Sequence, residues 1–269
     1  MVTNTLIGGP QCACGKLPSL TYGGYSRGSV ALFWTPNNLD RRTLPVKMSV
    51  EVERKFLCSD GTLKILEEIA VCMGQQQFHD QYFDTPEFEL TLRDMWLRKR
   101  KGCWELKCPT ATVNGTEDRS AEQSLAAALC THYKEITNLP EIQQRVEEVF
   151  KKTCEDRESE TAPSLGDESW LCRMNLVCFA EYVTVRRSFT LGDEGVQIDL
   201  DQADFGYHVG EIEVLIPEGG DVQSAQEKIR NAAHKLGLSE HERVEGKMNV
   251  YLKRYQPEHY AKLLSAHVL

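Results

Sequence analysis

One short stretch, Glu51-Val52-Glu53-Arg54-Lys55, indicates the architecture of the whole chain. On a β-strand, its residues at two-residue spacing (Glu51, Glu53 and Lys55) project from the same face. The two carboxylates would then stand about 7 Å apart, and Lys55 alone cannot neutralise both of them. A divalent cation beside the pair would balance the charge. The stretch therefore predicts a strand that carries part of a charged, metal-binding surface.

The same alternation of charged and apolar residues recurs in four further segments. Two of them are acidic, Asp199-Leu200-Asp201 and Glu211-Ile212-Glu213, whereas the segments 96–100 and 104–107 carry bases. Any one of these segments, taken alone, also fits a strand with a solvated polar face. Because acids and bases are sorted onto different strands, the set favours a lumen divided into a metal side and a phosphate side. The apolar residues would then face outward under helices: Val50, Val52, Leu97, Leu106, Ile198, Leu200, Ile212 and Val214.

Length, charge and cysteine content limit the class of protein. A chain of 269 residues can form one large β-rich or α+β domain, or two small ones. The net charge of -9 argues against general nucleic-acid binding, which needs a basic face. The 10 cysteines include no C-x-x-C pair, so reduced thiols in the cytosol are expected. No apolar run suits a signal peptide or a membrane span. We expect a cytoplasmic monomer that binds neither nucleic acid nor membranes.

Residue patterns divide the chain into an extension and one domain. Residues 1–47 are rich in Gly, Pro, Ser, Thr and Asn and predict a disordered extension, with the folded domain over 48–269. Helices are expected after Ser59, over 139–154, over 221–236 and from Pro257, and an acidic loop over 155–168. About eight strands can close into a barrel. The expected strand segments are 48–57, 79–84, 96–101, 103–108, 131–137, 180–191, 196–203, 207–216 and 247–254.

The motif Glu51-x-Glu53-x-Lys55 resembles the signature of the CYTH, or triphosphate tunnel metalloenzyme, superfamily. Longer strings, at residues 96–100, 104–109, 201–207 and 209–213, resemble those of its vertebrate thiamine triphosphatase branch. The likeness covers residues 48–269. It implies a β-rich α+β fold in which eight antiparallel strands close into a barrel tunnel with flanking helices. It also implies Mg²⁺ as cofactor and hydrolysis of thiamine triphosphate to thiamine diphosphate and phosphate.

The resemblance also implies roles for individual residues. The metal side would consist of Glu51, Glu53, Asp199, Glu211 and Glu213. The phosphate side would consist of Lys55, Arg98, Arg100, Lys107, Arg186 and Lys247. A one-residue slip in the strand would turn Arg187 inward in place of Arg186.

Lys107 and Tyr82 are the candidate catalytic residues. Packed among other cations, Lys107 is expected to have a lowered pKa and to activate water or to protonate the leaving group. The lysine–tyrosine pairing of the resembling family assigns Tyr82 as its partner, although Tyr82 equally fits a packing role on its strand.

Trp96 is the candidate for recognising the rest of the substrate. It shares the alternation of Arg98 and Arg100 and so is expected to face the lumen, where its ring could stack on the cationic thiazolium. Packing is the alternative role for a tryptophan on a strand. Three other functions share the same phosphate site: an inorganic triphosphatase, a nucleotide-using enzyme such as an adenylyl cyclase, and a non-catalytic polyphosphate-binding module.

Overall fold

The computed structural model describes residues 49–110, 127–151, 169–192, 195–239 and 242–269. The predicted extension over 1–47 and the predicted loop over 155–168 lie outside these residues. All the candidate site residues lie within them.

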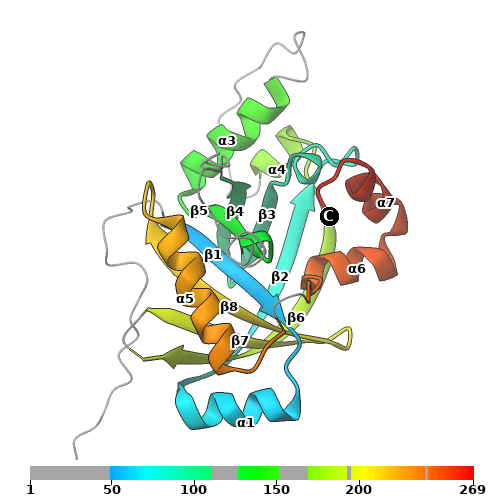
Figure 1. The fold of residues 1–269 in the computed structure, drawn as a ribbon. Coiled ribbons are helices and arrows are strands. Elements are labelled where there is room, and N and C mark those ends of the chain that lie inside the picture. Colours follow the sequence, from blue (N-terminus) through cyan, green and yellow to red (C-terminus); the bar gives the residue numbers. More distant parts are fainter. Residues whose placement is uncertain (1–48, 111–126, 152–168, 193–194, 240–241) are drawn as a thin grey trace, which may run out of the picture. The chain divides into compact units, whose positions relative to one another are not determined.

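Eight antiparallel strands close into a barrel in the order β1-β5-β4-β3-β2-β6-β7-β8 (Figure 1). This confirms the predicted fold class. The strands are β1 (Ser49–Phe56), β2 (Val71–Asp84), β3 (Trp96–Arg100), β4 (Cys103–Pro109), β5 (Cys130–Ile136), β6 (Val177–Leu191), β7 (Val196–Ala203) and β8 (Tyr207–Pro217). Closure leaves no unpaired sheet edge.

The helices flank the barrel. They are α1 (Asp60–Ile69), α3 (Leu139–Lys151), α4 (Ser169–Arg173), α5 (Val222–Lys235), α6 (Lys247–Tyr255) and α7 (Pro257–Ser265), with a short 3₁₀ helix η1 (Thr91–Arg93). Local signals set several of the starts. Ser59 caps α1 by accepting from the Thr62 backbone N–H at 3.1 Å, and Asp221 caps α5 in the same way. Pro257 occupies the first turn of α7.

The strand predicted over 247–254 is wrong, because this segment forms the helix α6. Its apolar residues Met248, Val250 and Leu252 alternate as on a strand, but Met248 and Leu252 also share one face of a helix. A ninth strand would find no edge to pair with, since the other eight close the barrel. Residues 247–255 therefore follow the helical period and form α6.

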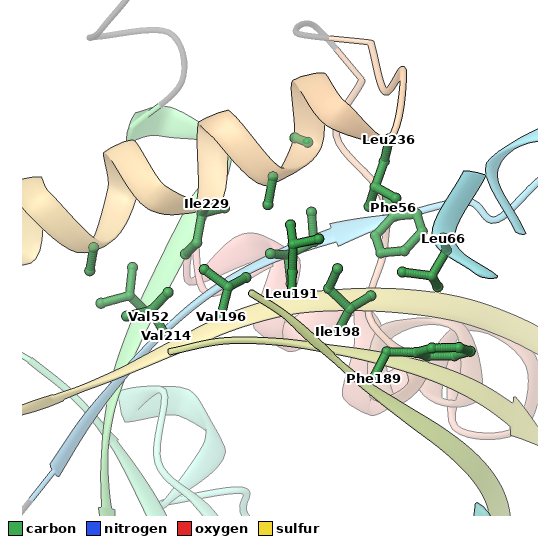
Figure 2. Packing of buried hydrophobic residues seen from close by; sticks show 14 of the residues in the cluster. Val52, Phe56, Leu66, Phe189, Leu191, Val196, Ile198, Val214, Ile229 and Leu236 are labelled. Atoms are coloured by element: carbon green, nitrogen blue, oxygen red, sulfur yellow. The ribbon is translucent and has the colours of Figure 1, made fainter. Parts of the chain in front are cut away.

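The main core lies outside the barrel, between the sheet and α5 (Figure 2). Val52, Ile198 and Val214 point outward from their strands toward the layer that contains Ile229 of α5 and Leu236, which directly follows this helix. Gly210 of β8 pairs with Phe56 of β1, and a Cβ added there would lie 2.2 Å from the Phe56 ring. Since apolar residues face the helices, the charged residues that alternate with them must face the barrel interior.

A second outer cluster lies under α3 and α4. Trp104 and Leu106 of β4 pack there with Ile142 and Val146 of α3 and with Trp170 of α4. These side chains are buried. The outer face of β3 and β4 is thus apolar, like that of β1, β7 and β8. The charged residues that alternate with these apolar ones on β3 and β4 therefore point into the barrel.

A third cluster joins α6 and α7 to the barrel. Met248 and Leu252 of α6 pack against Tyr82 and Tyr182, which project from the inner faces of β2 and β6. Since Tyr82 lies near the end of β2, the contact with Tyr82 places α6 toward the end of the barrel at which β2 finishes and β3 begins.

The helix α7 is held by a buried polar chain. His259 is 1% exposed and its ring stacks on that of Phe88, with the centroids 3.8 Å apart. Its Nε2 lies 2.8 Å from Thr91 Oγ1, which donates to the buried carboxylate of Asp84 at 2.7 Å. Asp84 also accepts the backbone N–H of Leu90 at 2.9 Å. The chain therefore fixes α7 to the β2–β3 connection.

Candidate active site

Strand register gathers the predicted site residues on the inner face of the barrel. Directly paired residues of neighbouring strands share a face. The pairs Glu53–Glu213, Lys55–Glu211 and Asp199–Glu211 join the acidic strands. The pairs Trp96–Lys107 and Tyr82–Arg98 join the basic ones. The alternation read from the sequence therefore gives the correct face for each of these strands.

The first basic group lies on β3 and β4. Arg98 donates from Nε to Glu105 at 2.5 Å and from Nη2 to Glu135 at 3.3 Å. Arg100 makes two bonds to the buried Asp80, at 2.5 and 2.6 Å. Arg100 therefore already has one carboxylate partner in a planar, two-pronged geometry, whereas Arg98 is shared between two carboxylates.

The second basic group is centred on Arg186 of β6. Its guanidinium donates twice to Asp201 at 2.6 Å, to Asp199 at 2.5 Å and to Glu211 at 2.8 Å. Lys247, at the start of α6, contacts Asp201 and also lies 3.0 Å from Glu211. Helix α6 thus supplies the cation Lys247 to this group, whereas the sequence predicted a strand at this position.

Arg186 is the arginine that faces the interior. Arg187 points outward and pairs with Glu67 of α1 at 2.7 Å. The side chain of Arg186 is only 12% exposed against 37% for Arg187. The register of β6 with β7, in which Arg186 pairs with Asp201, is the reason.

The Phe78 ring lies between the two basic groups. The Arg100 guanidinium carbon is 3.9 Å from its centroid and that of Arg186 is 5.6 Å away. Both distances suit cation–π contact. Phe78 therefore helps to keep two guanidiniums close together inside the barrel.

Lys107 does not have the lowered pKa that the sequence suggested. Burial alone would lower it, but the carboxylates of Glu51 and Glu53 outweigh burial and raise the pKa of Lys107. The ammonium group contacts Glu51 directly. In the same pair, burial would raise the pKa of Glu51, yet Lys107 holds it below the usual value. The expectation was wrong because the carboxylates of β1 lie nearer to Lys107 than a pattern of bases on β3 and β4 implied.

Two carboxylates, those of Glu213 and Asp199, lie in surroundings that raise the pKa and so disfavour the ionised form. Burial, with the neighbouring carboxylates of Glu51 and Asp199, raises the pKa of Glu213 well above its usual value. Asp199 is fully buried, and its Oδ1 has no hydrogen-bond partner in the described residues. Hard oxygen donors that repel one another in this way suit a divalent cation. Within the described residues no three His, Cys, Asp or Glu side chains already converge as ligands, and Arg186, Lys107 and Lys55 hold several of these carboxylates.

Tyr82 and Trp96 lie at the end of the barrel that α6 covers. The Tyr82 hydroxyl accepts from Tyr182 Oη at 3.4 Å, and Tyr82 lies opposite Arg98 in register. Its bond to Lys107 was an expectation, and no such bond occurs in the described residues. Trp96 is half-buried, packs at the edge of the α6 cluster and donates from Nε1 to Asp94 at 2.8 Å.

Sequence reasoning missed several interior groups, among them Asp80, Tyr133, Glu135 and Asp94. Asp80 follows the alternation Phe78-x-Asp80-x-Tyr82, and Glu135 and Tyr133 share the inner face of β5, so the same two-residue rule could have found them. Asp94 carries no such signal, because it lies outside the strands with a φ of 57°. Its place beside Trp96 and Tyr133 depends on the tertiary fold.

Known proteins resemble this chain over the residues that form the barrel and its interior. Residues 49–246 match the CYTH domain family. The chain is 37% identical over 228 residues to the thiamine-triphosphatase of Homo sapiens, covering 80% of this chain and 89% of the human protein. It is 36% identical over 226 residues to the thiamine-triphosphatase of Macaca fascicularis, with the same coverage. Among solved structures, the PH1819 protein from Pyrococcus horikoshii OT3 is 20% identical with a TM-score of 0.49, covering 76% of this chain and 99% of that one. No described helix combines the length and apolar character of a membrane span.

Proposed function

The chain belongs to the CYTH domain family, within the thiamine triphosphatase group, and from this premise we propose that it hydrolyses thiamine triphosphate to thiamine diphosphate and phosphate inside the barrel. The observation that carries the proposal is the sorting of two basic groups and a carboxylate cluster onto one inner face, in a chain 37% identical to a thiamine-triphosphatase. Phosphoryl transfer to water needs positioning and charge stabilisation, and such a surface offers both.

The basic groups would bind the triphosphate. Arginine offers paired donors that match two oxygens of one phosphate, so Arg98, Arg100 and Arg186 suit this role. Lys55, Lys107 and Lys247 would add single charged contacts. Each of these cations now contacts a carboxylate, so the phosphate oxygens would take over the position that those carboxylates occupy.

The released carboxylates would hold Mg²⁺. The proposed ligands are Glu51, Glu53, Asp199, Glu211 and Glu213, all hard oxygen donors. When bound, Mg²⁺ would neutralise phosphate charge and orient the attacking water. The crowding of carboxylates around Glu213 and the unpartnered Asp199 oxygen support this assignment. Since binding of the anion frees the metal ligands, we expect substrate and metal to strengthen each other's binding.

Lys107 would stay protonated during the reaction. Glu51 and Glu53 raise its pKa, and a protonated ammonium group suits hydrogen bonding to the phosphate oxygens and to the leaving diphosphate. Tyr82, opposite Arg98, would lie beside the same oxygens and add a hydroxyl donor. The Trp96 ring would stack on the thiazolium.

The reduced state of the cysteines supports a cytosolic location, since all seven in the described residues are free thiols.

A hydrolysis panel tests the proposal. Phosphate release would be measured with thiamine triphosphate, ATP and inorganic triphosphate, each with Mg²⁺ and with EDTA. We expect thiamine triphosphate to give the highest kcat/KM and EDTA to abolish turnover. Equal turnover of all three substrates would indicate a general triphosphatase. Binding of inorganic triphosphate without turnover of any substrate would indicate a polyphosphate-binding module.

A further inference from the structure

Asp94 differs from the other carboxylates of this part of the barrel. Glu51, Glu105 and Asp80 each contact a lysine or an arginine. Across the residues that the structure describes, Asp94 forms no ion pair. Its side chain instead accepts from two neutral donors, the indole Nε1–H of Trp96 at 2.8 Å and the hydroxyl of Tyr133, at 3.0 Å from one carboxylate oxygen and 3.2 Å from the other.

The environment of Asp94 leaves its charge only partly compensated. Burial raises the pKa of its carboxyl group, and the hydrogen bonds from Trp96 and Tyr133 oppose that rise without cancelling it. All three side chains remain half-buried and so within reach of a ligand. A carboxylate beside an aromatic ring attracts a cation in two ways, by its charge and by the quadrupole of the ring.

The backbone holds Asp94 firmly in this place. It ends η1 with a φ of 57° in the left-handed region, which Asp and Asn tolerate better than other side chains. Its N–H bonds to Thr91 at 2.9 Å, and Thr91 is itself anchored to Asp84 and His259. The Asp94 carboxylate can therefore fix the plane of the indole two residues later.

The group also adjoins the phosphate site. Trp96 pairs in register with Lys107, and Tyr133 pairs with Glu51, the residue that Lys107 contacts. A ligand that lies on the indole would thus have its neighbouring atoms near Lys107. Such an arrangement fits a molecule with a cationic ring at one end and a polyphosphate at the other.

We propose that Asp94 is a specificity-determining residue, which holds Trp96 and Tyr133 and adds a negative charge beside them, and so selects cationic over neutral ring systems. The inference rests on the proposed function, which it deepens. A quaternary ring nitrogen has no hydrogen to donate, so recognition must come from charge and from an aromatic face. A neutral nucleobase lacks the charge–charge attraction to Asp94 that a cationic ring gains, so we expect ATP to be bound less well here.

The central test is Asp94→Asn, which keeps an acceptor for the indole and tolerates the left-handed backbone. We expect kcat/KM for thiamine triphosphate, divided by that for inorganic triphosphate, to fall about five- to thirtyfold. Where inorganic triphosphate is not turned over, its inhibition constant replaces its kcat/KM. Tyr133→Phe should lower the ratio less, because the charge remains. Glu87→Gln, which alters an exposed carboxylate of the same connection, is the matched control and should keep the wild-type ratio.

An equal loss for both compounds in Asp94→Asn would overturn the proposal, since Asp94 would then be only structural. If the wild type did not hydrolyse thiamine triphosphate, the proposed function would fail. The cation site would then be judged by calorimetric titration with thiamine itself, which has no phosphate. At least fivefold weaker binding to Asp94→Asn than to the wild type would support the site. Equal binding to both, or none to the wild type, would refute it.

Discussion

At the scale of single residues, Glu213 combines burial with repulsion from like charges. It is 3% exposed, and the carboxylates of Glu51 and Asp199 act on it. A protein that binds no cation there would gain stability by losing one of these charges. Retaining all three carboxylates is therefore a sign of function more than of folding.

We predict that Glu213→Gln lowers Mg²⁺-dependent hydrolysis of thiamine triphosphate by about 100-fold or more, because it removes a proposed metal ligand. The melting temperature of the metal-free variant should equal or exceed that of the wild type, since repulsion is relieved. Steady-state kinetics against Mg²⁺ concentration and thermal unfolding measure the two effects. Glu218→Gln, at an exposed glutamate just after β8, is the control. Wild-type turnover at saturating Mg²⁺ would remove Glu213 from the metal side.

Trp96 permits a second prediction at this scale. Trp96→Ala should reduce kcat/KM for thiamine triphosphate about five- to thirtyfold, which corresponds to about 1–2 kcal/mol of cation–π stacking. Inorganic triphosphate should be affected far less, because the arginines and lysines remain. Parallel kinetics on both substrates measure the difference. Equal losses would make Trp96 a packing residue of the α6 cluster.

At the scale of elements, α6 and α7 determine how one end of the barrel is covered. The helix α6 contributes Lys247 to the interior and Met248 to the aromatic cluster, so one element both supplies a cation and closes space around it. Its position depends on α7, which follows almost directly. The buried chain from His259 through Thr91 to Asp84 is therefore the attachment point for both helices.

This attachment predicts a pH dependence of stability. Burial, followed by the neighbouring Lys262, lowers the pKa of His259 to about 4, below its ordinary value of 6.5. A base whose pKa is depressed by folding favours the folded state only while neutral, so its contribution is complete above pH 6.5 and is lost as the pH falls toward 4. Near pH 4.5 the loss should reach about 2 kcal/mol.

The comparison is between the wild type and His259→Phe, which keeps the ring that stacks on Phe88 but cannot titrate. Urea unfolding at pH 7.5 and 4.5 should show a fall in the free energy of unfolding that is about 2 kcal/mol larger for the wild type. His79→Gln, at an exposed histidine, should follow the wild type. Identical falls for wild type and His259→Phe would show that His259 does not control acid stability.

At the scale of the whole molecule, the CYTH match begins at residue 49, and every proposed site residue lies after it. We therefore predict that residues 48–269 alone unfold cooperatively and hydrolyse thiamine triphosphate with a kcat/KM within about twofold of the full chain. Circular dichroism melting and kinetics on both proteins provide the measurement. Loss of cooperative unfolding on truncation would assign a structural role to residues 1–47.

Much of the fold and the site follows from the sequence by itself. Two-residue alternation is a local property, so it placed Glu51, Arg98 and Glu211 on strands and on a common face before any contact was known. Capping and turn signals likewise marked the starts of α1 and α7. Sorting of acids and bases onto different strands predicted a divided interior, and in the structure bases pair with acids of other elements, as Lys107 does with Glu51 and Arg186 with Asp201.

Only the tertiary structure decided the contacts between strands and helices. The run 247–254 has both periods, and closure of the barrel by eight other strands made it a helix. The raised pKa of Lys107 depends on Glu51, 56 residues away in sequence. Asp94 meets Tyr133 only because β3, β4 and β5 are neighbours in the sheet. Local periodicity sets the face on which a side chain lies, whereas the partners on that face, and hence its charge state, follow from long-range strand order.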